Sequence, residues 1–171
     1  MNAPESGRPA RMILLPLPLF PLQPILSRIV RRVAAENPSM FNRLGPWVGA
    51  DYIIDPINLP FALHLRPDRE QPILRAVSRR ALPPHAAHIS GKFLDLLELI
   101  DADLDGDALF FSRALVIEGN TEAVVSLRNA LDDIDGSIAE RVAGMFGAPG
   151  RAALTAMRRA GERARHKEAR A

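Results

Sequence analysis

The apolar pattern of the chain changes period at Gly119–Asn120, and this change limits the possible folds more than any other feature of the sequence. Before it, Leu115 and Ile117 alternate with outward-facing residues, as in a half-buried strand. Asn120 is a favourable helix N-cap, and Glu122 would lie in the first turn, where the helix dipole favours a carboxylate. After it, apolar residues recur at helical spacing at Val124, Leu127, Leu131 and Ile134. The sequence therefore predicts a strand that turns directly into an amphipathic helix.

The remaining patterns predict further helices and strands on either side of this unit. Asn37-Pro38 ends the first helix, and Gly147 with Pro149-Gly150 ends the last helix before the tail. We expect helices over residues 25–36, 93–100 and 137–146, with a shorter one from residue 39 to about residue 45. We expect strands over residues 61–66, 73–78 and 86–90.

A proline-rich apolar segment covers residues 12–26. Its four prolines argue against a regular helix, and it is too short and too broken to span a bilayer. It also lacks the Ala-x-Ala cleavage site of a signal peptide. We therefore expect an extended arm over residues 1–24 and a domain over residues 25–150. The arm either packs on the domain, covers a ligand entrance or dips into lipid.

Charge is distributed unevenly along the chain. Residues 1–80 carry 11 basic and 6 acidic side chains, residues 81–150 carry 4 and 12, and residues 151–171 carry 7 and 2. The basic tail over residues 151–171 is predicted to be helical. Basic ends favour an anionic surface such as phospholipid, although a charged tail can also be merely solvated. Nucleic acid is disfavoured, because no aromatic residues are interleaved with the tail as stacking platforms.

Sequence motifs that are typical of catalytic or metal-binding sites are weak or missing. The chain has no cysteine, which excludes disulfides, thiolate metal sites and a cysteine nucleophile. The acidic run Asp101–Asp107 begins like a calcium loop, but its twelfth position is Ser112 instead of the closing glutamate. His85 and His88 would point to opposite faces if they lay on one strand, and no third ligand is near them in sequence. We therefore predict no catalytic residues, no metal and no cofactor, and a protein that is not an enzyme.

Residues 109–122 read Leu-Phe-Phe-x-Arg-x-Leu-Val-Ile-Glu-Gly-Asn-Thr-Glu. This run resembles the signature of the type-two sterol carrier protein domain. It is most similar to the bacterial branch that serves as an accessory factor in ubiquinone biosynthesis, the UbiT-like proteins. The similarity is specific from Leu109 to Asp133 and looser from Ile25 to Ser90. Arg113-Ala114 stand where the wider family usually has Gly-Lys, which favours the ubiquinone branch, and Gly119–Asn120 replace the usual Gly-Asp.

The resemblance implies a fold and a ligand. The fold is α/β, with a mostly antiparallel sheet of about five strands covered by helices and enclosing an apolar lipid cavity. Nine residues are candidates for binding lipid: Phe93, Leu97, Phe110, Phe111, Leu115, Ile117, Val124, Leu127 and Leu131. Plain packing in a core is the competing interpretation of the same apolar pattern.

The implied function is that of a non-catalytic accessory factor. It would hold polyprenylated ubiquinone precursors for hydroxylating partners that act without oxygen. A general lipid or fatty-acyl carrier and an enzyme of unknown chemistry are the alternatives. We expect a cytoplasmic protein that contacts the inner membrane peripherally through residues 12–26 and the basic tail.

Overall fold

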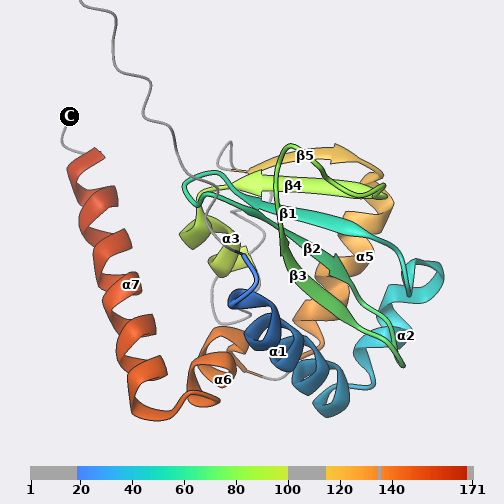
Figure 1. The fold of residues 1–171 in the computed structure, drawn as a ribbon, viewed down its shortest axis with the longest axis horizontal. Coiled ribbons are helices and arrows are strands. Elements are labelled where there is room, and N and C mark those ends of the chain that lie inside the picture. The colour runs from blue at the N-terminus through green and yellow to red at the C-terminus, as the bar shows by residue number, and fades with distance from the viewer. Residues whose placement is uncertain (1–18, 100–114, 135, 169–171) are drawn as a thin grey trace, which may run out of the picture.

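The computed structural model describes residues 19–99, 115–134 and 136–168. Its helices and its strands are shown in Figure 1. The helices are α1 (Leu22–Glu36), α2 (Met40–Leu44), the 3-10 turn η1 (Gly45–Trp47), α3 (Phe93–Leu99), α5 (Thr121–Asp132), α6 (Ile138–Gly144) and α7 (Gly147–Glu168). The strands are β1 (Tyr52–Pro56), β2 (Ala62–Arg66), β3 (Ile73–Val77), β4 (Ala87–Gly91) and β5 (Leu115–Gly119).

The strands form one five-stranded sheet in the order β3-β2-β1-β4-β5. The β1–β4 pair is parallel, and the other three pairs are antiparallel. The predicted mixed α/β fold with a mostly antiparallel sheet is confirmed. The strand β1 was not predicted from the sequence, because its central position buries residues on both faces and removes the alternating pattern.

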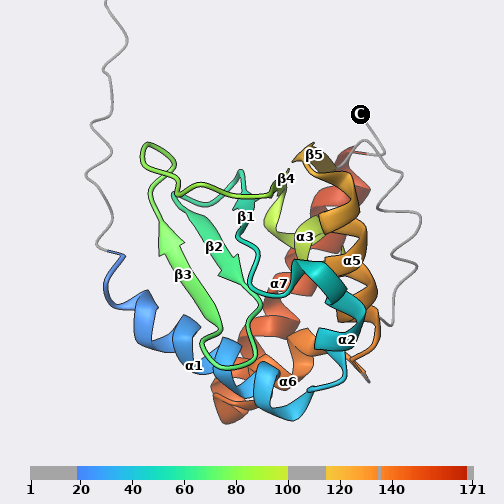
Figure 2. The same cartoon turned by 90° about the vertical axis from the view of Figure 1, so that its right-hand side faces the viewer.

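The helices lie mainly on one side of this sheet. Figure 2 shows α3, α5 and α7 on the same side, while α1 runs beside the edge strand β3. The pairs α2–α5 and α6–α7 pack on each other. The main core forms where these helices meet the sheet, around buried side chains such as Leu44, Tyr52 and Ile89. No helix in the described part of the chain is both long enough and apolar enough to cross a membrane.

The turn from β5 into α5 forms as the sequence predicts. The side-chain oxygen of Asn120 accepts a hydrogen bond of 3.0 Å from the backbone N–H of Ala123, which caps α5. Gly119 has a φ of +89°, and a Cβ there would lie 2.5 Å from the backbone oxygen of Ala86. Only glycine fits, because both the backbone conformation and the close strand contact exclude a side chain.

Two helices begin earlier than the prolines led us to expect. The helix α1 begins at Leu22 and includes Pro24, three residues before the predicted start at Ile25. The helix α7 begins at Gly147 and includes Pro149, although these residues were expected to separate a helix from the tail. Both prolines fall in the first turn of a helix, where the missing N–H has no intrahelical partner to lose.

Candidate functional site

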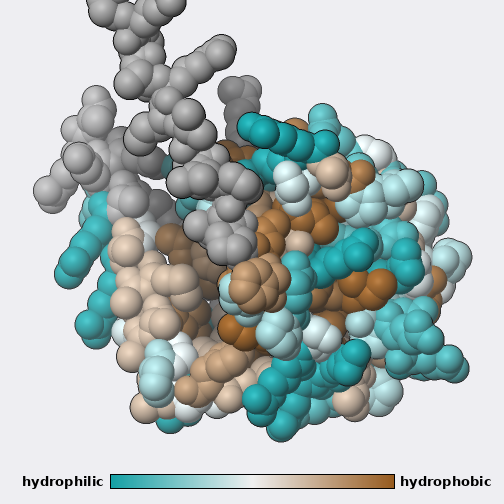
Figure 3. Space-filling view, in the orientation of Figure 1, coloured by the Kyte–Doolittle hydropathy of each residue, from teal (hydrophilic) through white to brown (hydrophobic). Residues whose placement is uncertain are grey.

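A cavity of about 490 Å³ lies between the helices and the sheet. The space-filling view shows apolar side chains gathered in the hollow between α7 and the body of the molecule (Figure 3). The sheet contributes side chains from β1 to β4, and helices α1, α2, α3, α5, α6 and α7 contribute most of the remainder. The walls therefore come from both halves of the chain.

The wall is almost entirely apolar. Its helical part includes Ile29, Val33, Phe93, Leu96, Leu97, Leu127, Leu131, Val142, Leu154 and Met157. Its sheet part includes Ile54, Leu63, Leu65, Leu74 and Ile89. Among the lining residues that the structure describes, Arg128 carries the one charged side chain. The volume falls within the range of about 300–1,000 Å³ that is usual for small-molecule sites. Such a cavity suits an apolar ligand and offers little to a polar one.

Local periodicity explains how each element faces the cavity. On β2, Leu63 and Leu65 point into it, while the intervening His64 points to the other face of the sheet. On α5, Val124, Leu127 and Leu131 fall on one face at helical spacing. The helix α5 is also fixed to the sheet, since the hydroxyl of Tyr52 donates a 3.2 Å hydrogen bond to the backbone oxygen of Ala123. Burial raises the pKa of Tyr52 to about 12, so this hydroxyl keeps its proton at neutral pH.

The structure brings together five of the nine residues predicted to bind lipid. Phe93, Leu97, Val124, Leu127 and Leu131 all line the cavity. Leu115 and Ile117 lie on β5 and pack in the core, outside the cavity wall. Phe110 and Phe111 lie outside the described residues, as does the acidic run Asp101–Asp107.

Sequence reasoning missed the contributions of α1 and α7. Ile29, Val30 and Val33 line the cavity from α1, and Leu154 and Met157 line it from α7. The apolar side of α1 was visible in its spacing but could equally have faced a solid core. The face of α7 was hidden because alanines dominate it, and a small apolar stripe is a weak signal.

A polar network occupies the sheet face opposite the cavity. The carboxylate of Asp51 accepts two 2.8 Å hydrogen bonds from Arg66 and contacts Nε2 of His64 at 2.5 Å. The Nε–H of Arg75 donates to Nδ1 of His64 at 2.9 Å, and His64 is only 1 % exposed. Partial burial acts to raise the pKa of Asp51, but hydrogen bonds from Arg66 and His64 and their charges outweigh it and hold that pKa below 3.8.

These groups satisfy one another, and the network faces away from the cavity. A second cluster lies further along the same face, where Arg79 donates a 2.7 Å hydrogen bond to Asp55.

The rings of His85 and His88 meet edge to face with centroids 5.7 Å apart, since His85 precedes β4 and does not lie on it. The two histidines do not share one strand, so the condition under which their rings would point to opposite faces is not met. Within the described ranges no group of three or more histidine or acidic side chains could hold a metal ion.

The fold and the cavity define a class of protein: an α/β domain whose helices and sheet enclose an apolar interior of ligand size. The chain belongs to the SCP-2 sterol transfer family, which matches residues 28–132. That range contains β1 to β5, α3 and α5, and so most of the cavity wall. The matched region is thus a lipid-binding domain of the sterol-carrier type.

Several solved structures are similar to this chain. One is a UbiJ-SCP2 ubiquinone synthesis protein, with 16 % identity, a TM-score of 0.48, and coverage of 71 % of this chain and 93 % of the other. Sterol carrier protein 2 from Yarrowia lipolytica has 8 % identity, a TM-score of 0.43, and coverage of 66 % and 88 %. The sterol carrier protein domain 2 of Helicoverpa armigera has 16 % identity, a TM-score of 0.44, and coverage of 78 % and 99 %. A comparison with curated proteins gives no match.

Proposed function

We propose that this protein is a non-catalytic carrier that holds the apolar tail of a lipid in the cavity between its helices and its sheet. The apolar wall around about 490 Å³ is the observation that carries the proposal. Membership of the SCP-2 sterol transfer family supports it. The polar networks on the other face of the sheet do not open into this cavity, which weighs against an enzyme that acts on a ligand bound there.

The energetics favour a ligand with a long tail. Each buried CH₂ contributes about 0.8 kcal/mol, so ten of them contribute roughly 8 kcal/mol. Association itself costs an estimated 4–15 kcal/mol or more in lost motion. A short apolar molecule would therefore bind weakly, whereas a prenyl or acyl chain gains enough from burial to be retained.

A polyprenylated ubiquinone precursor is the ligand that we favour. The run over residues 109–122 supports this choice, because it resembles the accessory branch of ubiquinone biosynthesis more than the general sterol-carrier pattern. In this role the protein would present the ring of the precursor to hydroxylases that work without oxygen. A general lipid or fatty-acyl carrier is the second candidate, since the wall contains no feature that requires an isoprenoid.

Mass spectrometry of an organic extract from the natively purified protein tests the proposal. We expect prenylated quinone-like compounds in stoichiometric amounts. Fatty acids or phospholipids in their place would support the general carrier. An extract without any lipid, from protein that also fails to take up a fluorescent lipid probe, would contradict a carrier function.

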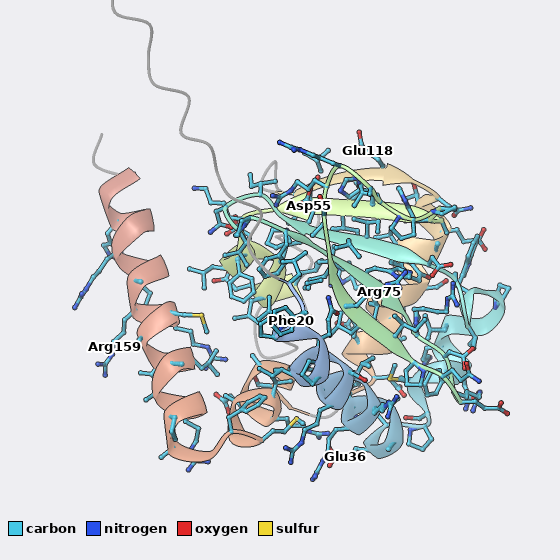
Figure 4. All side chains as sticks on the ribbon, in the orientation of Figure 1. Phe20, Glu36, Asp55, Arg75, Glu118 and Arg159 are labelled. Carbon is cyan, nitrogen blue, oxygen red and sulfur yellow. The ribbon has the colours of Figure 1, made fainter. Side chains whose placement is uncertain are left out.

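We further propose that the protein works in the cytoplasm and contacts the inner membrane peripherally. Phe20, at the N-terminal end of α1, is 76 % exposed, and Ile25 is 42 % exposed. Figure 4 shows Arg159 projecting from α7 away from the sheet. Exposed apolar and basic side chains together suit an anionic leaflet, where each basic residue contributes about 1 kcal/mol.

Co-sedimentation with anionic liposomes tests this contact. Arg159→Glu removes one attraction and adds one repulsion, so we expect binding to weaken by roughly 2 kcal/mol, or about thirtyfold. Arg80→Glu is the matched control, because Arg80 is exposed and follows β3, and so belongs neither to α7 nor to the arm. Equal losses in both variants would point to a nonspecific charge effect. Equal binding by the full chain and by a chain without residues 1–24 would dismiss a role for the arm.

A further inference from the structure

The cavity is closed at one end and open at the other. At the closed end, Ile89 on β4 and Val124 on α5 are each 2 % exposed, and Leu127 is 4 % exposed. Among the exposed large apolar side chains of the described residues, only Phe146 and Met157 line the cavity, and they are 39 % and 38 % exposed. The open end therefore lies beside α7, where Figure 3 shows the hollow between this helix and the body of the molecule.

The volume of the cavity limits how much of a lipid it encloses. A dry cavity of about 150 Å³ engineered into another protein binds benzene, so each of the six carbon atoms takes up about 25 Å³. At that density about 490 Å³ holds roughly twenty carbon atoms, which is one long acyl chain or about four isoprene units. The surrounding wall does not expand at low cost, because protein interiors are close-packed.

We propose that the cavity encloses one lipid tail of up to about twenty carbons, and that the remainder of a longer tail stays in the membrane. The inference rests on the proposed carrier function and sets the size class of its ligand. The end of the tail enters first, because the side chains at the closed end are apolar. The head group, with any carbons in excess, then lies beyond Phe146 and Met157 at the open end.

Tail length then decides whether the protein removes a lipid from a bilayer. Enclosed carbons cost little, because they exchange one apolar environment for another. Each CH₂ that is left in water lowers the affinity about fourfold. Tails within the limit leave the bilayer with the protein, whereas a longer tail holds the complex at the membrane surface. The prenylated compounds that co-purify with the protein in solution are then those of about four isoprene units or fewer.

Extraction of prenyl alcohols from phosphatidylcholine vesicles tests this limit. Separate vesicle samples carry farnesol, geranylgeraniol or solanesol, which contain three, four and nine isoprene units, at the same mole fraction. The full chain is incubated with each sample, the vesicles are removed by centrifugation, and the alcohol bound per protein is measured against a sample without protein. We expect similar occupancy for farnesol and geranylgeraniol, and an occupancy for solanesol that is lower by about a hundredfold or more.

Val124→Phe and Val125→Phe form a matched pair of variants. Val124 lines the closed end, whereas Val125, the next residue of α5, is 41 % exposed and does not line the cavity. A phenyl ring at position 124 brings about four more carbon atoms into the cavity and leaves room for about sixteen. Extraction of geranylgeraniol should then fall by about tenfold or more, while farnesol is still extracted. Val125→Phe should behave as the wild type with all three alcohols.

The outcomes separate the two proposals. Equal extraction of solanesol and geranylgeraniol by the wild type would overturn the limit and leave the carrier function standing. Unchanged extraction of geranylgeraniol by folded Val124→Phe would overturn it as well. If that variant does not fold, the series with the wild-type protein still decides the question. Extraction of none of the three alcohols would overturn the carrier function, and the limit with it.

Discussion

Replacing Leu127 by tryptophan distinguishes a hollow interior from a filled one. Leu127 is 4 % exposed and lines the cavity from α5. In a close-packed core the larger side chain would cost typically 1–3 kcal/mol through overpacking. Beside a cavity of about 490 Å³ the indole has room to enter, so the stability of the ligand-free protein should stay close to that of the wild type.

The same substitution should weaken lipid binding. The indole adds about six non-hydrogen atoms to the volume of the leucine, and each displaced CH₂ of a ligand forfeits about 0.8 kcal/mol. If the ligand retains half of the lost contacts by shifting, the loss is roughly 2.5 kcal/mol, or about fiftyfold in Kd. Titration with a fluorescent lipid probe measures the affinity, and thermal unfolding of the delipidated protein measures the stability.

Leu44→Trp provides the matched control. Leu44 is fully buried in the main core, belongs to α2, and does not line the cavity. There the indole should lower Tm by roughly 2–4 °C for each kcal/mol of overpacking, with little effect on the affinity of the folded fraction. A fall in Tm for Leu127→Trp as large as for Leu44→Trp, with lipid affinity unchanged, would refute the reasoning that α5 faces a ligand site.

Three further substitutions test the framework that holds the cavity. Asn120→Ala should cost about 1 kcal/mol in denaturant unfolding by removing the cap of α5, and an unchanged midpoint would contradict that role. Gly119→Ala should lower the free energy of unfolding by about 1–3 kcal/mol through backbone strain. A loss well below about 1 kcal/mol would contradict the close contact between Gly119 and the neighbouring strand. Asp51→Asn should cost about 2 kcal/mol at pH 6, because it weakens charge-assisted hydrogen bonds. Folding lowers the pKa of Asp51, so the difference in unfolding free energy between the wild type and Asp51→Asn should be fully present above pH 3.8. The difference should vanish as the pH falls through the folded-state pKa of Asp51. A difference that does not depend on pH would refute the lowered pKa.

The sequence carried enough information to predict the fold class and the unit from β5 to α5. The turn at Gly119–Asn120 combines a positive φ with a capping side chain, and both are local requirements that a sequence displays directly. The strand β1 was not predicted, because it lies between β2 and β4 and is buried on both faces. A strand of that kind shows no alternation, and its partners are distant in sequence.

The cavity was harder to predict than the sheet. A helix face such as that of Leu127 and Leu131 has the same pattern whether it meets a neighbour or a void. Arg128 was overlooked because a single arginine beside apolar residues usually marks the edge of an amphipathic face. The starts of α1 and α7 were misplaced because prolines were interpreted as breaks, whereas both occupy a first helical turn. Lipid binding by the nine candidate residues stays a prediction.

The parallel pairing of β1 with β4 has a consequence for how the protein persists in a cell. It joins residues 52–56 to residues 87–91 at the centre of the sheet, and helices from both sides of this pair in sequence complete the cavity wall, so the cavity exists only in the folded chain. A guest that binds the assembled cavity and not the unfolded chain adds about 2.7 kcal/mol of stability when its free concentration is 100 times Kd. Copies without a guest would then unfold more often and be degraded first, and we expect the cellular level of the protein to follow the supply of its lipid.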